Sequence, residues 1–424
     1  MSFPRRRESR PLIRVTLLDS RTKGIAISRS SRSRSEIGNL RGNDKKDMPT
    51  KSSKHRRVDM PVQKGKADRP FLYATFALFV IGLIILSSAS MAIAYKDHGS
   101  VAYHTLRQLR LGGAIGIAAL SLCTLMPYRH WKRLALALIV LSLVLTAIIF
   151  IPQLSYDAGG ARRWLNLRFF SLQPSEILKL GFIVYLAAWL DARRKDIRSV
   201  SYGMMPFALM ISIIGIFLMM QKDLGTLAVI IATAGIMYFL GGGKISQMGT
   251  MFAFGTAAVY FLVVMTPYRL ARVMAFLNPS NDPRGAAYHI NQAFIAIGSG
   301  GFWGLGFGRS MQKYNYLPEP MTDSIFAIFG EEMGFIGVCA LLVLFCFFFW
   351  RALTIAKKAP DMFGRILATG LAVSIMVQAF INMAAISGLL PLTGITLPFI
   401  SYGGTSLAIT MGMAGIILNI SKHA

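Results

Sequence analysis

The chain has 424 residues, of which 54% are hydrophobic and 15% are charged, and its formal net charge at pH 7 is +27. This composition is too apolar for a soluble enzyme and is typical of a protein that crosses a membrane many times. The three cysteines lie in apolar runs and the six histidines are scattered. We therefore expect no disulfide framework and no metal site built from His and Cys.

Residues 1–70 are rich in Lys and Arg and contain almost no apolar run. This pattern predicts a basic, disordered cytoplasmic tail that is attracted to anionic lipid headgroups. No aromatic residues are interleaved with the charges, so we do not expect binding to nucleic acid. The sequence thus divides into the tail, 1–70, and a transmembrane domain, 71–424.

The transmembrane domain is predicted to be all-α and polytopic, because about ten apolar runs of spanning length follow one another. The predicted spans are 71–93, 109–126, 134–151, 175–190, 205–220, 224–240, 250–265, 324–350, 364–387 and 403–420. An even number of spans puts both termini on one side, and the basic tail and basic short loops assign that side to the cytoplasm. Helices 7 and 8 are then joined by a large extracytoplasmic loop, 266–322, with helical character at 286–297.

The predicted outer loops are unusually basic, which opposes the usual charge bias of membrane proteins. The residues concerned are Arg162, Arg163, Arg168, Arg269, Arg272, Arg284, Arg309 and Lys313. Either an anionic ligand such as a phosphate or diphosphate, or contact with lipid headgroups, would explain this charge.

Residues 316–335 join the long loop to an apolar helix, and they carry acids across the junction. The pattern predicts that Thr322 or Asp323 caps the helix, and that small residues from Ala327 to Gly337 allow another helix to approach closely. A carboxylate at a membrane boundary is a functional-site candidate. The alternative is that Asp323 is only a cap and that Glu331 and Glu332 are structural ion-pair partners.

Other polar residues fall inside the predicted spans. Glu176 and Lys179 are three residues apart on one helix face and can form a pair. Gln378 and Asn382 are four residues apart and can bridge to a neighbouring helix, which favours a structural role. Asp223 opens a span. None of these positions forms a Ser-His-Asp or Cys-His arrangement, and no P-loop or HExxH motif is present.

Five stretches of sequence resemble the SEDS family, the FtsW, RodA and SpoVE group of bacterial cell-wall polymerases. They are Gly160-Ala161-Arg162-Arg163-Trp164 with Gln173-Pro174-Ser175-Glu176-Ile177-Leu178-Lys179; Asp223-Leu224-Gly225-Thr226; Asn278-Pro279 through Asp282-Pro283; Ala296-Ile297-Gly298-Ser299-Gly300-Gly301 through Gln312-Lys313 to residues 316–335; and Gly388-Leu389-Leu390-Pro391 through Leu397-Pro398-Phe399-Ile400-Ser401-Tyr402-Gly403-Gly404. Thr396 before Leu397 is more similar to the division member, FtsW, than to the elongation member, RodA. Departures include Lys222 where many members have proline, and Ala286-Ala287-Tyr288-His289 in place of a Gly-Tyr-Gln type run.

This resemblance implies a peptidoglycan glycosyltransferase that polymerises lipid II, an undecaprenyl-diphosphate-linked disaccharide-pentapeptide, during cell division. Asp323 matches the family's essential acid and would act as general base. The implied substrate-binding residues are Arg162, Arg163, Trp164, Lys179, Arg272, Lys313 and Glu319. The implied structural or cavity-lining residues are Glu176, Asp223, Glu331, Glu332, Gln378, Asn382 and Ser401.

The resemblance also implies a setting: the bacterial inner membrane at the division septum, with a class B penicillin-binding protein and other divisome proteins as partners. No protein metal site is expected, although a divalent cation, Mg²⁺ or Mn²⁺, could accompany the diphosphate. Three alternatives stay open. The chain could be a RodA-like polymerase of cell elongation, a lipid II flippase with Lys179, Glu176 and Arg163 along its path, or a scaffold without chemistry.

Overall fold

The structure, a computed structural model, describes residues 65–158, 161–166, 171–278, 287–314 and 316–424. All of them belong to one compact unit, Met60–Ala424. The basic tail predicted for residues 1–70 therefore lies almost wholly outside the described residues. The described part of the chain is mostly helical, as predicted.

Thirteen α-helices and two π-helical turns occur in the described residues. They are α1 (Arg69–His98), α2 (Tyr103–Arg107), η1 (Gln108–Gly113), α3 (Ala114–Leu125), α4 (Tyr128–Ile148), α5 (Pro174–Ala192), η2 (Val200–Met204), α6 (Met205–Met220), α7 (Leu224–Leu240), α8 (Ile245–Val264), α9 (Pro267–Leu277), α10 (Tyr288–Gly300), α11 (Ile325–Lys358), α12 (Met362–Ile386) and α13 (Gly404–Ser421).

Every predicted span coincides with a helix or with consecutive helical segments. Within the described residues, seven of these are long and apolar enough to cross a membrane: Arg69–His98, Tyr103–Leu125, Tyr128–Ile148, Val200–Met220, Ile325–Lys358, Met362–Ile386 and Gly404–Ser421. α7 is apolar but shorter, and α5 carries the ionisable residues Glu176, Lys179 and Asp191. The chain is thus a multi-pass membrane protein, and the count of ten spans stays a prediction.

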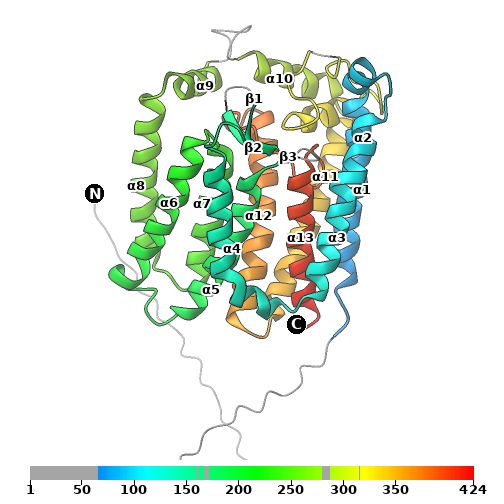
Figure 1. Ribbon diagram of the computed structural model, residues 1–424. Coiled ribbons are helices and arrows are strands. Elements are labelled where there is room, and N and C mark those ends of the chain that lie inside the picture. The colour runs from blue at the N-terminus through cyan, green and yellow to red at the C-terminus, as the bar shows by residue number, and fades with distance from the viewer. Residues whose placement is uncertain (1–64, 159–160, 167–170, 279–286, 315) are drawn as a thin grey trace, which may run out of the picture. The chain divides into compact units, whose positions relative to one another are not determined.

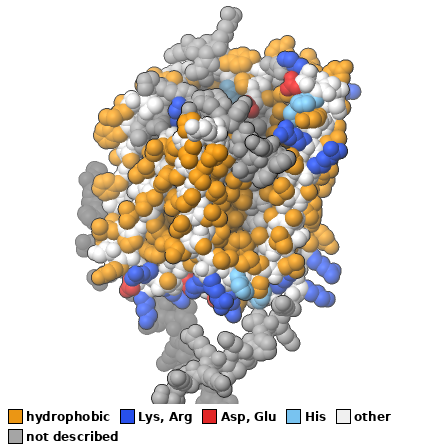
Figure 2. All heavy atoms as spheres, in the orientation of Figure 1, with side chains coloured by type: hydrophobic (Ala, Val, Ile, Leu, Met, Phe, Trp, Pro, Cys, Tyr) orange, Lys and Arg blue, Asp and Glu red, His pale blue; other side chains and the backbone are white. Residues whose placement is uncertain are grey.

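α12 and α13 form the centre of the bundle, because nearly all of their side chains are buried. α12 packs against α5, α7 and α11, and α13 packs against α3. In Figure 1 they run side by side up the middle of the view, in orange and red. Apolar side chains cover most of the visible side of the bundle, and Lys and Arg gather along its lower end (Figure 2). An apolar belt with a charged rim is the surface expected of a helix bundle in a bilayer.

A small sheet, absent from the all-α prediction, lies between α4 and α5. It consists of β1 (Ser155–Ala158), β2 (Ala161–Asn166) and β3 (Ser171–Leu172), paired antiparallel in that order. The sheet, α2, α9 and α10 lie at the same end of the bundle (Figure 1), which we call the loop end. The predicted long loop 266–322 is therefore folded in part, with α10 close to the helix expected at 286–297.

α11 is two helices joined at a break, where Gly334 has φ 62° and ψ −164°. The break exposes backbone groups, and the glycine-rich segment 301–306 satisfies them. The N–H groups of Leu305 and Gly306 donate to the carbonyls of Glu331 and Glu332, each at 3.0 Å, and Phe335 N–H donates to the carbonyl of residue 301 at 3.0 Å. The glycine-rich segment is therefore packed tightly against the break in α11.

Candidate functional site

The segment 316–324, which we call the acid strap, leads into α11 at the loop end. Glu319 has a left-handed backbone (φ 49°), and its carbonyl accepts the N–H of Ser324 at 3.2 Å, which closes a tight turn. The Ser324 hydroxyl donates to the carbonyl of Pro318 at 2.8 Å and lies 2.6 Å from Nε2 of His289 on α10. Because the serine proton is used on Pro318, the histidine Nε2 carries the proton of that contact.

The predicted helix cap at Thr322 or Asp323 is wrong. α11 begins at Ile325, after Ser324, and no side chain caps it. The Thr322 hydroxyl instead donates to the Glu319 carboxylate at 2.9 Å. The helix starts one residue later than the predicted span 324–350, and the Asp323 carboxylate is not used to cap the helix backbone.

Two residues predicted as structural or cavity-lining, Asn382 and Ser401, hold the backbone of the acid strap. The Asn382 amide on α12 donates to the carbonyl of Asp323 at 2.9 Å and to that of Ile395 at 2.7 Å. Ser401 donates to the carbonyl of Thr322 and accepts the N–H of residue 397 at 2.7 Å. These bonds fix the position of Asp323 relative to the central helices.

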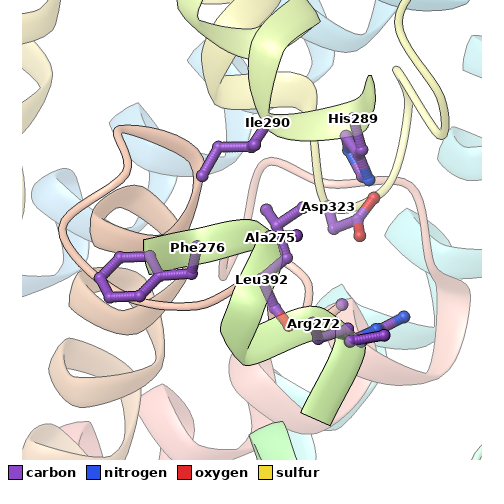
Figure 3. A pocket seen from close by; sticks show the side chains of 9 residues that line it. Arg272, Ala275, Phe276, His289, Ile290, Asp323 and Leu392 are labelled. Carbon is purple, nitrogen blue, oxygen red and sulfur yellow. Dashed lines mark hydrogen bonds between the residues drawn. The ribbon is translucent and has the colours of Figure 1, made fainter. Parts of the chain in front are cut away.

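Asp323 lines a cavity of about 260 Å³ at the loop end. The cavity wall consists of Ala271, Arg272, Ala275, Phe276, His289, Ile290, Asp323, Leu392 and Gly394. Figure 3 shows the Asp323 carboxylate between the His289 imidazole and the Arg272 guanidinium. Arg272 also donates to the carbonyl of Leu392 at 3.3 Å, which ties α9 to the 388–401 segment. The cavity therefore combines one acid, one cation and an apolar wall.

The environment of the cavity shifts the pKa values of Asp323 and His289 so that the uncharged form of each is favoured. Burial, reinforced by the negative charge of Glu319, raises the pKa of Asp323 to about 7; Thr322 and Arg272 oppose this more weakly. Burial and the positive charge of Arg272 lower the pKa of His289 to about 4. Near pH 7 the imidazole is therefore neutral, and Asp323 can both accept and release a proton, as a general base requires.

Arg163 approaches the same site from the sheet. A Cβ atom built on Gly394 would lie 3.7 Å from Asp323 Oδ2 and 3.9 Å from Arg163 Nη1, so both side chains border that glycine. Gly394 has φ 69°, a conformation that favours glycine. Arg163 also donates to the carbonyl of Lys222 and, at 3.5 Å, to that of Gln221. A second guanidinium therefore lies near the acid.

Lys179 does not reach the cavity. Its ammonium is 2.8 Å from the Glu176 carboxylate and also donates to Gln378, and all three side chains are buried. The Gln378 amide in turn donates to the carbonyl of Thr396 at 3.0 Å. This buried network holds the 388–401 segment, part of which lines the cavity. That arrangement fits the structural role predicted for Gln378.

Lys313 is likewise fully buried, away from the cavity wall. Its ammonium lies 3.1 Å from the Glu332 carboxylate, which also accepts the Ser88 hydroxyl at 2.5 Å. Glu331 accepts the Ser310 hydroxyl and, at 3.0 Å, the N–H of residue 311. Lys313 and both glutamates therefore hold the loop before the acid strap. The ion-pair alternative agrees with the structure for Glu332, whereas Glu331 acts through hydrogen bonds.

The remaining predicted residues lie around the site. Trp164 is half-buried on β2, opposite Tyr156. Glu319 is exposed on the acid strap, and Asp223 caps α7 by accepting the N–H of residue 226 at 3.2 Å. Arg162 lies on β2, and its side chain is outside the described residues.

Sequence reasoning missed part of the cavity wall. In the sequence, His289 stands out only as a departure from the family pattern, and nothing distinguishes the 392–394 turn or the inner face of α9. They reach Asp323 through tertiary packing that no local spacing reveals. Helical periodicity in 267–277 could have indicated that α9 has an apolar face next to Arg272.

The fold and site define a polytopic membrane protein with a single acid in a basic, partly apolar cavity at one end of its bundle. A family model described as "Cell cycle protein" (FtsW/RodA/SpoVE) matches residues 69–424. This chain belongs to the FtsW/RodA/SpoVE family, and it is a multi-pass protein of the bacterial inner membrane.

Individual relatives agree with this assignment. The chain is 38% identical to stage V sporulation protein E of Bacillus subtilis over 86% of this chain and 100% of that protein. It is 39% identical to the probable peptidoglycan glycosyltransferase FtsW of Trichlorobacter lovleyi, over 85% and 94%. Among solved structures, it resembles a chain of a peptidoglycan synthase complex that couples polymerization and crosslinking (TM-score 0.68, 26% identity, 84% and 97% covered). It also resembles RodA of Thermus thermophilus (TM-score 0.61, 25% identity, 84% and 96% covered).

Proposed function

We propose that this chain is a peptidoglycan glycosyltransferase that polymerises lipid II, with Asp323 as the general base. The main support for this proposal is the environment of the Asp323 carboxylate. It lines a cavity, its backbone is fixed by Asn382, and burial raises its pKa to about 7. Membership in the family, and relatives named as peptidoglycan glycosyltransferases, support the substrate class.

The proposed reaction is a direct displacement at a sugar. The hydroxyl oxygen of the acceptor sugar forms a bond to the anomeric carbon of the donor, while the bond from that carbon to the lipid diphosphate breaks. The hydroxyl proton passes to the Asp323 carboxylate, and the diphosphate leaves with the electron pair. General-base catalysis of this kind contributes about 10²–10⁴-fold to a rate.

Arg272 and Arg163 are placed to stabilise the diphosphate, since both guanidiniums lie beside Asp323 (Figure 3 for Arg272). A guanidinium binds phosphate oxygens in a fixed fork, so it also orients the leaving group. We propose Arg162 and Trp164, on the same strand β2, as further substrate contacts. Lys313 and Lys179 are better assigned to structural ion pairs, because both are buried against glutamates.

A divalent cation, Mg²⁺ or Mn²⁺, would enter with the substrate under this proposal. Such ions are usually held by one or two carboxylates together with substrate phosphates. Asp323 lines the cavity, and Glu319 is close enough for its charge to raise the Asp323 pKa. These two carboxylates fit that limited role; the ion would neutralise diphosphate charge.

We infer that the loop end faces the periplasm and that both termini are cytoplasmic. The basic loops predicted to be cytoplasmic agree with the Lys and Arg gathered at the opposite end of the bundle (Figure 2). We also propose a role in division at the septum, with a class B penicillin-binding protein and other divisome proteins as partners. A relative of known structure belongs to a complex of polymerization and crosslinking, which supports such a pairing.

The test is polymerisation of lipid II by the purified protein, with and without its transpeptidase partner, resolved as glycan chains on a gel. We expect wild-type protein and His130→Ala, a change of an exposed residue on α4, to form chains, and Asp323→Asn to form none above background. Chains of normal yield from folded Asp323→Asn protein would remove the general-base assignment. Deletion of the gene followed by microscopy would separate the roles: filaments indicate division, whereas round cells indicate a RodA-like role in elongation.

A further inference from the structure

A second cluster of ionisable residues lies where α1 turns into α2, at the loop end. α1 ends at His98, and Gly99 reverses the chain with φ 67° while its N–H donates to the carbonyl of Tyr95 at 2.9 Å. α2 begins four residues later, at Tyr103, and packs back against α1. The turn therefore brings His104 next to the end of α1, although His104 follows His98 by six positions in sequence.

The ligand atoms of Asp97, His98 and His104 all lie within 4.8 Å of one another. Asp97 and His98 are exposed, whereas His104 is only 9% exposed. Within the described part of the chain, neither ring nitrogen of His104 has a hydrogen-bond partner. Leaving a buried polar group without a partner is unfavourable, so a ligand from outside the chain would stabilise this ring.

We propose that Asp97, His98 and His104 bind a divalent transition-metal ion of the Zn²⁺ class. Two imidazoles and one carboxylate are a donor set that such ions accept, with water or another ligand in the open position. Bonds of about 2.0–2.2 Å place tetrahedral ligand atoms roughly 3.3–3.5 Å apart. The exposed side chains of Asp97 and His98 can close that difference by rotation, while His104 provides a fixed nitrogen.

The surrounding aromatic rings hold the two imidazoles in place. His98 stacks on Tyr103 with 3.6 Å between ring centroids, and stacking leaves its nitrogens exposed at the ring edge. The His104 ring meets the Tyr402 ring in an edge-to-face contact at 5.6 Å. Tyr402 N–H donates to the carbonyl of Met321 on the acid strap at 2.8 Å. A bound ion would thus stabilise the turn between α1 and α2. That turn contacts Tyr402, whose N–H holds the acid strap.

The experiment uses the full-length protein, purified in detergent with an affinity tag that contains no histidine, and Co²⁺ as a spectroscopic probe. We expect one equivalent of Co²⁺ to give saturable d–d absorption bands, and Zn²⁺ to displace it and raise the temperature of unfolding. Asp97→Asn and His98→Ala should each weaken Co²⁺ binding at least tenfold. Both residues are exposed, so these variants keep the core intact.

His130→Ala is the matched control, because His130 is an exposed histidine on α4, outside the cluster. This variant should bind Co²⁺ as the wild type does. Absence of saturable Co²⁺ binding to the wild type would overturn the proposal. Equal binding by the wild type, Asp97→Asn and His98→Ala would also overturn it, because the metal would then bind elsewhere. Neither result depends on lipid II polymerisation, so the test of the metal site is independent of the test of the proposed function.

Discussion

The raised pKa of Asp323 predicts a pH dependence that an ordinary aspartate would not give. With a pKa of about 7, the carboxylate is about 9% ionised at pH 6 and about 91% at pH 8. If Asp323 is the general base, the polymerisation rate at saturating lipid II rises about tenfold over this interval. An aspartate with the ordinary pKa of 3.8 would be fully ionised throughout, and the rate would be flat.

The neighbours allow a sharper version of this test. His289 does not contribute to the rise, because its pKa of about 4 leaves it neutral between pH 6 and 8. Glu319→Gln removes a negative charge that raises the Asp323 pKa, so the midpoint of the profile should move to lower pH. The assay is the initial rate of chain formation from fluorescent lipid II across pH 5.5–9. A flat wild-type profile, or a midpoint that Glu319→Gln leaves unchanged, would refute the reasoning.

The same pKa predicts an effect on stability. A carboxyl group whose pKa is raised in the folded state binds more protons there, so stability falls as pH rises from about 4 to about 7. The difference between about 7 and 3.8 corresponds to about 4 kcal/mol at about 1.4 kcal/mol per pH unit. Asp323→Asn should therefore unfold at a higher temperature than wild type at pH 8, with little difference at pH 4. A variant less stable than wild type at pH 8 would contradict the burial argument.

Three further predictions concern packing and substrate binding. Glu332→Gln should lower the free energy of unfolding by about 3–5 kcal/mol, because it leaves the buried Lys313 ammonium without its ion-pair partner. Unfolding in mild detergent measures this loss, and a loss below about 1 kcal/mol would count against a buried ion pair. Gly300→Ala should destabilise the protein by about 1–3 kcal/mol, because the new Cβ would lie 2.1 Å from a backbone oxygen of α11. Gly298→Ala should be near neutral, because a Cβ at that position meets no atom. Equal effects of the two variants would show that α10 and α11 do not approach closely at Gly300. Arg272→Ala should raise the lipid II concentration that gives the half-maximal rate at least tenfold, because a substrate contact is lost. Chain-formation kinetics measure this concentration, and an unchanged value would remove Arg272 from the substrate contacts.

The helices could be predicted from the sequence because hydrocarbon imposes a length and composition that are visible in single runs of residues. Asp323 could be found because an acid at the start of an apolar helix is conspicuous. The roles of the lysines could not. Lys313 and Glu332 are 19 residues apart, and their pairing depends on how the loop folds back on the break in α11. That break itself is set at one glycine inside an otherwise continuous helical pattern.

The small sheet and part of the cavity wall escape sequence-based prediction for a related reason. The strands are two to six residues long and lie in a loop, below the length at which alternation gives a clear signal. Arg272 is among the predicted substrate-binding residues, but His289 and Gly394 come from two further segments that only tertiary packing brings to Asp323.

The most direct test of Asp323 as general base separates binding from turnover in one variant. Purified Asp323→Asn, which keeps the shape of the side chain, would be compared with wild type for lipid II binding in nanodiscs and for chain formation in the same preparation. If Asp323 is the general base, lipid II binding should stay within a few-fold of wild type while the rate falls by at least about 100-fold. A variant that binds lipid II normally and still polymerises it at the wild-type rate would show that Asp323 is not the general base.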